Sequence, residues 1–135
     1  MQTYERVFKY LDNQVDDVTD WLCKYVKFRS VMGHELEAQK WIRDQLEKFG
    51  VFDEIDFWAV DPEAKRPNVV GVIKGRRPRK GHKLIFNIHS DVVPVAEEEL
   101  PKWTVDPWEP TVKDKMVFGR GAVDMKGGGA ASLWA

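Results

Sequence analysis

The stretch that decides the fold is LIFNIHSDVVP, residues 84–94, in which an apolar run ends in polar side chains. The run at 84–88 is nearly continuous, which is typical of a strand buried on both faces and predicts the central strand of a sheet. His89 and Asp91 follow directly, and Pro94 ends regular pairing. Because residues two apart on an extended chain point to one side, both polar side chains are predicted to converge.

Upstream of this run, hydrophobic periodicity predicts two helices and two strands. Apolar residues recur at steps of three and four across residues 7–25, which indicates one helix with a single buried stripe. A second helix is predicted over 35–49, with Gly50 placed to end it in the left-handed conformation. Alternation over 51–60 and the apolar run of 68–75 predict strands that precede the central one.

Downstream, a long irregular segment contains tryptophans and prolines between residues 103 and 110. A short strand at 116–118 then leads through a glycine-rich turn into a helix near the end of the chain. The pattern as a whole predicts an α/β fold, a mixed sheet flanked by helices, in one domain over residues 1–135.

Composition excludes several classes of protein. Apolar residues make up 43% and charged residues 32%, which is typical neither of disorder nor of a membrane span. The net charge of −1 supplies no electrostatic reason to expect nucleic acid or a membrane as partner. A lone Cys23 and an N-terminus without the apolar core of a signal peptide favour a cytoplasmic protein.

Two charged stretches carry alternative interpretations. The basic segment KGRRPRKGHK, residues 74–83, is either a solvated turn or a nucleic-acid patch. The solvated turn is favoured, because no aromatic residues are interleaved to stack on bases. The acidic segment AEEEL, residues 96–100, is likewise interpreted as a solvated loop rather than a metal site.

His89 and Asp91 are the first candidate site residues. An imidazole with a nearby carboxylate at the carboxyl end of a strand suits either metal ligation or the orientation of a ligating histidine. The alternative, a strand-end histidine with an ordinary hydrogen-bond partner, stays open on these two residues alone.

Asp124 is the third candidate and lies in the turn GRGAVDMKGGG, residues 119–129. Glycines allow the close backbone approach and unusual dihedrals that a carboxylate site at a turn needs. A phosphate-binding loop is the alternative, but the stretch lacks the Walker spacing, and its aspartate would repel phosphate.

Three motifs, HSDVVP, WTVDPWEP and GRGAVDMKGG, occur in this order and at a spacing that resembles one enzyme family. It is the zinc-dependent amidohydrolase and exopeptidase family, which includes acetylornithine deacetylase, succinyl-diaminopimelate desuccinylase, aminoacylase and carboxypeptidases. SVMGHELEAQKWIRDQLEKFG and RPNVVG resemble its deacetylase-like branch, so the resemblance covers the chain from about Ser30 onward.

The resemblance implies roles for the three candidates. His89 would ligate one metal ion, and Asp91 would be the catalytic-site aspartate that braces the His89 ring. Asp124 would bridge two metal ions, Zn²⁺ with Co²⁺ as a substitute, and would precede a cis peptide bond at Asp124–Met125. The reaction implied is metal-assisted hydrolysis of an amide bond in an N-acyl amino acid or a short peptide.

The resemblance also implies parts that these 135 residues do not supply. The family's general-base glutamate, its remaining ligands and its lid or dimerisation domain lie downstream, and none of residues 97–99 matches that base. The chain is therefore predicted to be the N-terminal portion of a catalytic domain, inactive alone, with a homodimer expected only for the complete protein. The alternatives are a related carboxypeptidase, an inactive binding module, or a nucleic-acid-binding protein.

Overall fold

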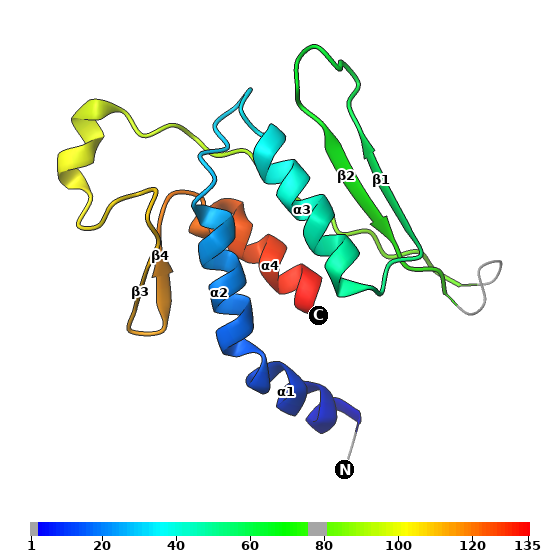
Figure 1. The fold of residues 1–135 in the computed structure, drawn as a ribbon. Coiled ribbons are helices and arrows are strands. Elements are labelled where there is room, and N and C mark those ends of the chain that lie inside the picture. The colour runs from blue at the N-terminus through cyan, green and yellow to red at the C-terminus, as the bar shows by residue number, and fades with distance from the viewer. Residues whose placement is uncertain (1–2, 76–80) are drawn as a thin grey trace. The chain divides into compact units, whose positions relative to one another are not determined.

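The structure is a computed structural model that describes residues 3–75 and 81–135 (Figure 1). Contacts between Cα atoms group the chain into two compact units, Met1–Arg29 with Val92–Ala135, and Ser30–Asp91. The helices are α1 (Thr3–Asn13), α2 (Val15–Val26), α3 (Leu36–Phe49) and α4 (Gly127–Trp134), with a 3₁₀ helix η1 (Glu97–Lys102) and a π-helical turn η2 (Ala122–Lys126). The strands are β1 (Glu54–Trp58), β2 (Asn68–Val72), β3 (Thr111–Lys113) and β4 (Met116–Phe118).

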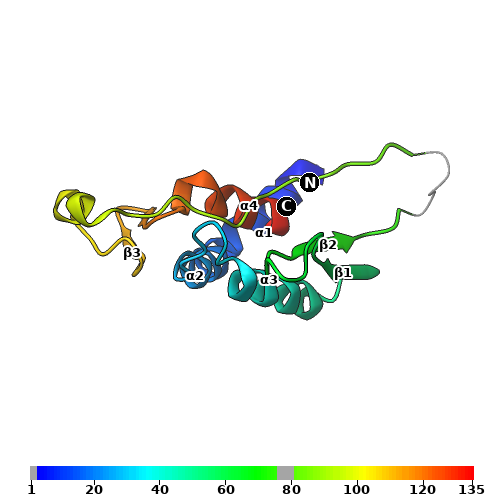
Figure 2. The same cartoon turned by 90° about the horizontal axis from the view of Figure 1, so that it is seen from above.

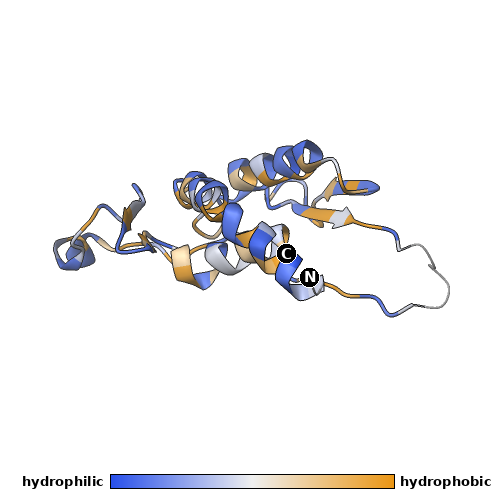
Figure 3. Ribbon diagram, turned by 90° about the horizontal axis from the view of Figure 1, so that it is seen from below, coloured by the Kyte–Doolittle hydropathy of each residue, from blue (hydrophilic) through white to orange (hydrophobic). Residues whose placement is uncertain are grey.

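The unit Ser30–Asp91 is a helix packed on a hairpin. β1 and β2 pair antiparallel, with Glu54 opposite Val72 at one end and Trp58 opposite Asn68 at the other. Figures 1 and 2 show α3 running alongside this sheet, and Figure 3 shows a largely hydrophobic β2. Gly71 leaves room for the Phe52 ring, because a Cβ at residue 71 would lie within 3.0 Å of that ring.

Predictions for α3 and β1 are confirmed. The helix covers 36–49 where 35–49 was expected, and Gly50 ends it with a left-handed φ of 66°. Along β1, exposed and half-buried residues alternate, so that Ile55 and Phe57 share the covered face. This agreement follows from local patterns, since the residues of a single segment determine both helical periodicity and strand alternation.

The predicted central strand at 84–88 is wrong for this chain. The segment has no strand conformation, and Leu84 and Ile85 are 79% and 81% exposed. Strand propensity depends on packing and pairing with neighbours, and no strand within the described ranges pairs with this segment. The basic stretch 74–83, for which a solvated turn was predicted, has residues 76–80 outside the described residues.

The helix predicted across residues 7–25 is broken at Gln14 into α1 and α2. The predicted stripe is covered only in part, since Val7 and Val15 are exposed whereas Tyr25 is buried. α1 buries none of its residues, whereas α2 packs against α4. No helix in the described part of the chain is long and apolar enough to cross a membrane.

Aromatic rings fill the contact between α2 and α4. The Trp21 ring lies with its centroid 5.4 Å from that of Tyr25 and 5.5 Å from that of Trp134, in tilted and edge-on arrangements. Such arrangements are the ones that aromatic quadrupoles favour. This cluster holds α4, and with it the preceding turn η2, against α2.

Two short elements complete the unit formed by residues 1–29 and 92–135. β4 confirms the strand predicted at 116–118, and it pairs antiparallel with β3, which the sequence did not indicate. The turn between them holds Asp114 and Lys115 at positive φ values of 51° and 62°. The loop expected at 96–100 instead begins the 3₁₀ helix η1, in which the Ala96 N–H donates to the Glu99 carboxylate at 3.3 Å.

Candidate metal centre

His89 and Asp91 lie together at the end of the unit Ser30–Asp91. His89 Nδ1 is 3.1 Å from the backbone carbonyl oxygen of Asp91 and 3.5 Å from its carboxylate Oδ1. A carbonyl oxygen only accepts, so in the neutral ring Nδ1–H donates to it and Nε2 carries the lone pair. The side chains are 47% and 37% exposed, which leaves the imidazole reachable from solvent.

Ser90, between the two, turns inward and is only 5% exposed. The hydroxyl of Ser30 donates to the Ser90 carbonyl oxygen at 2.6 Å, in a buried contact. The amide of Gln39, on α3, donates to the Ser90 hydroxyl at 3.0 Å. Sequence reasoning missed this serine, although alternation between two outward-facing site residues is the signal that would have found it.

Glu35 and Arg66 form an ion pair that joins the segments SVMGHELEAQKWIRDQLEKFG and RPNVVG. Glu35 is 4% exposed, and its carboxylate accepts the Gly33 N–H at 3.0 Å and Arg66 Nη2 at 2.9 Å. Burial alone would raise the pKa of this carboxyl. Hydrogen bonds from the backbone N–H groups of Gly33 and of Glu35 itself, together with Arg66, outweigh it and hold the pKa below its ordinary value.

Asp124 lies in the other unit, in the π-helical turn η2. Its φ of −119° and ψ of 101° are not helical, and the peptide bond Asp124–Met125 is cis, which confirms the geometry expected from the resemblance. The Asp124 side chain is exposed. The metal-ligand roles of His89 and Asp124 and the catalytic role of Asp91 stay predictions.

Two glycines near Asp124 have the features that the sequence predicted, an unusual dihedral at Gly121 and a close backbone approach at Gly127. Gly121 opens the turn with a φ of 82°, a conformation that favours glycine. The Gly127 N–H donates to the Ala122 carbonyl oxygen and closes the turn. A Cβ at residue 127 would lie within 3.0 Å of that oxygen, so the close approach requires glycine.

Lys126, in the same turn, holds it in place through two hydrogen bonds of its amine. The residue is fully buried, and Nζ donates to the carbonyl oxygens of Tyr25 at 3.1 Å and Phe28 at 2.8 Å. The Tyr25 carbonyl lies in the last turn of α2 and the Phe28 carbonyl two residues beyond its end, and a cation is favoured at this end of a helix. Burial lowers the pKa of the Lys126 amine to about 8. Sequence reasoning gave this residue no role, because no local pattern separates a buried lysine from a solvated one.

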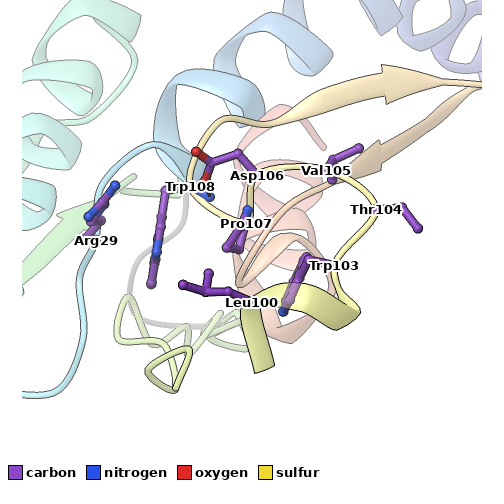
Figure 4. Close-up of a pocket in the computed structure, with 8 residues that line it drawn as sticks. All are labelled: Arg29, Leu100, Trp103, Thr104, Val105, Asp106, Pro107 and Trp108. Carbon is purple, nitrogen blue, oxygen red and sulfur yellow. Dashed lines mark hydrogen bonds between the residues drawn. The ribbon is translucent and has the colours of Figure 1, made fainter. Parts of the chain in front are cut away.

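The WTVDPWEP motif forms an open hollow of about 520 Å³ (Figure 4). The Arg29 guanidinium lies 5.3 Å from the Trp108 ring centroid, and Arg120 lies at the same distance from the Trp103 ring. The backbone N–H of Trp108 donates to Asp106 Oδ1 at 2.8 Å, which fixes the bend of the motif. The hollow therefore combines indole surfaces with one cation.

The donors that the candidates offer suit a divalent metal ion only in part. In an imidazole whose Nδ1–H is donated, the lone pair is on Nε2, and such a nitrogen is a donor that zinc accepts. Within the described residues, no three His, Cys, Asp or Glu side chains are grouped to hold an ion. His89 thus fits as one ligand with an orienting partner, and it does not make a closed site by itself.

The chain is similar in sequence to one known family and to several known proteins. Residues 85–135 match peptidase family M20/M25/M40. The chain is 44% identical over 99 residues to N-formyl-4-amino-5-aminomethyl-2-methylpyrimidine deformylase of Halalkalibacterium halodurans, covering 73% of this chain and 22% of that protein. It is 33% identical over 119 residues to succinyl-diaminopimelate desuccinylase of Nautilia profundicola, covering 88% and 29%.

Among solved structures, human carnosine dipeptidase 1 superposes with a TM-score of 0.74 and 23% identity, over 97% of this chain and 30% of that one. This likeness confirms the fold class. The chain spans less than a third of the length of each of these proteins. The match to peptidase family M20/M25/M40 over residues 85–135, which contain all three motifs, therefore bears out the resemblance.

Proposed function

We propose that this chain supplies His89 and Asp91 to a metal-dependent hydrolase that cleaves the amide bond of a small N-acyl compound. The observation that carries the proposal is the engagement of His89 Nδ1 by Asp91, 3.1 Å from its carbonyl oxygen. That contact presets the tautomer in which Nε2 is a metal ligand.

The names of the relatives support removal of an acyl group. The deformylase and the desuccinylase are both named for taking a small acyl group from a nitrogen, whereas the dipeptidase likeness concerns the fold alone. N-Acyl amino acids, of the kind an acetylornithine deacetylase hydrolyses, are the substrate class we propose. A formylated aminopyrimidine and a short peptide are the alternatives to assay beside them.

Zinc, two ions in a complete site with cobalt as a substitute, is the cofactor we propose. His89 and Asp124 would hold metal, and Asp91 would orient the His89 ring. When bound, zinc polarises a carbonyl group and lowers the pKa of water. The chain's own contribution is therefore to supply donors and to keep the imidazole in one tautomer.

The setting we propose is the cytoplasm, because a lone Cys23 suits a reducing compartment. The partner is a small-molecule substrate rather than nucleic acid or a membrane. A homodimer is proposed only for a longer protein that contains a dimerisation domain.

Zinc binding by the chain itself tests the proposal. His89 and Asp124 supply fewer than the four donors of a closed zinc site, so we expect weak uptake, completed by solvent. Calorimetric titration of wild type against His89→Ala and Asp124→Asn should show that uptake depends on His89. Uptake unchanged in His89→Ala would contradict the proposal. Tight uptake of two ions by the wild-type monomer would instead refute the expectation that these residues supply only part of the site.

The second candidate is an inactive module that keeps the fold and binds a partner. It is favoured by the lack of any group of three ligating side chains in the described part of the chain. The longest reading frame that contains these residues should be assayed with N-acetylornithine, N-succinyl-diaminopimelate and a formylated aminopyrimidine, with added zinc or cobalt. Turnover that disappears in His89→Ala supports the hydrolase, and no turnover of any of the three favours the module.

A further inference from the structure

We propose that Gln39 and Ser30 are positioning residues for the His89 metal ligand and act through Ser90. The inference rests on the proposed function and deepens it, because it identifies what holds the ligand in its metal-binding tautomer. All the contacts that carry it lie within the unit Ser30–Asp91.

The first step concerns the backbone between His89 and Asp91. Exposure alternates along the three residues: His89 and Asp91 face solvent, whereas Ser90 is 5% exposed. On an extended chain, fixing the middle residue inward directs both neighbours outward. The orientation of the imidazole is thus set from the buried side of the segment.

The second step concerns the Ser90 carbonyl. It accepts the Ser30 hydroxyl at 2.6 Å, across 60 residues of sequence and away from solvent. This bond fixes the peptide plane that joins Ser90 to Asp91. The Asp91 carbonyl belongs to the next peptide unit along the chain, and it accepts Nδ1–H of His89 at 3.1 Å.

The third step concerns the Ser90 side chain. Its hydroxyl accepts the Gln39 amide at 3.0 Å, so a donor from α3 and a donor from the segment before α3 hold the same residue. Without them the Asp91 carbonyl oxygen loses its fixed position beside Nδ1 of His89. The Nδ1–H tautomer would then lose its acceptor, and the Nε2–H tautomer, which cannot ligate through Nε2, would gain population.

The ring tautomer is the readout that a merely structural role would not change. The chain, labelled with ¹⁵N at histidine, is examined by NMR as wild type, Gln39→Leu and Ser30→Ala, and melting temperatures are recorded in parallel. Gln45→Leu is the matched control, because Gln45 lies on the same helix with similar partial burial. Ser30→Thr retains the hydroxyl and serves as the conservative rescue. Zinc is then titrated into each sample while the His89 ring signals are followed.

We expect wild type, Gln45→Leu and Ser30→Thr to hold His89 as the Nδ1–H tautomer. Gln39→Leu and Ser30→Ala should mix the two tautomers and bind zinc about tenfold more weakly, the lower end of the loss seen when supports of metal ligands are removed. If both remain folded with the wild-type tautomer and zinc affinity, the inference is overturned. A lower melting temperature with an unchanged tautomer overturns it too, because the contacts then serve only the fold.

Failure of the proposed function would look different. If zinc uptake by wild type does not depend on His89, as judged with His89→Ala, while the tautomer still shifts in Gln39→Leu, the metal role is refuted and the control of the ring by Ser90 stands. The two readouts therefore separate the inference from the function on which it rests.

Discussion

Gly127→Ala should destabilise the turn that carries Asp124, whereas Gly128→Ala should not. Both glycines belong to α4, and the φ of −64° at Gly127 suits any residue. The difference lies in what an added methyl group would meet. At Gly127 it would lie within 3.0 Å of the Ala122 carbonyl oxygen, which is backbone and cannot swing aside, whereas at Gly128 nothing lies within 4 Å.

The magnitude follows from two opposing effects. Forcing a methyl group into a packed site costs about 1–3 kcal/mol, and replacing glycine by alanine in a helix gains up to about 1 kcal/mol. Gly127→Ala should therefore lose about 1–2 kcal/mol net, because the clash also stretches the hydrogen bond from residue 127 to Ala122. Gly128→Ala should gain about 0.5–1 kcal/mol, since only the helical gain applies.

Thermal and urea unfolding followed by circular dichroism measure this pair. For a chain of this size about 1 kcal/mol corresponds to roughly 4 °C in melting temperature. Gly127→Ala should melt about 4–8 °C below wild type, and Gly128→Ala a few degrees above it. If Gly127→Ala is as stable as Gly128→Ala, the close approach at Ala122 does not limit the turn and the reasoning fails.

Three further predictions concern other parts of the chain. Because the folded pKa of Glu35 is lowered, its stabilising effect is complete above the ordinary glutamate pKa and is lost as pH falls through the lowered value. Urea unfolding measured from pH 7 to pH 3 should therefore show a loss of stability with falling pH that is smaller in Glu35→Gln. The exposed control Glu37→Gln should keep the wild-type pH dependence. Lys115→Gly should stabilise the β3–β4 hairpin by about 0.5–1 kcal/mol, because φ is 62° at this residue. Lys113→Gly, within β3, should destabilise the hairpin. Melting temperatures in the opposite order would count against this account of the turn. The 135-residue chain alone should not hydrolyse N-acetylornithine with zinc or cobalt, since loss of a general base costs about 10²–10⁴-fold, and turnover that His89→Ala abolishes would show that a base is present after all.

Local patterns in the sequence determined much of the architecture. The limits of α3, its end at Gly50 and the alternation along β1 were predictable, because a helical period, a left-handed terminus and a pleat are each set by residues within one segment. The glycine-rich turn around Asp124 and its cis bond were predictable from the motif. The candidate residues His89, Asp91 and Asp124 were identifiable for the same reason, since motif spacing is a property of the sequence.

Tertiary structure decided what those patterns leave open. An apolar run such as 84–88 is a strand only where another strand pairs with it, and the described chain supplies none. The break at Gln14 and the exposure of Val7 depend on which helix finds a partner. Lys126 is buried because two carbonyls at the end of α2 accept its amine, about a hundred residues away in the chain. Contacts between residues far apart in sequence leave no local period, so only the folded chain reveals them.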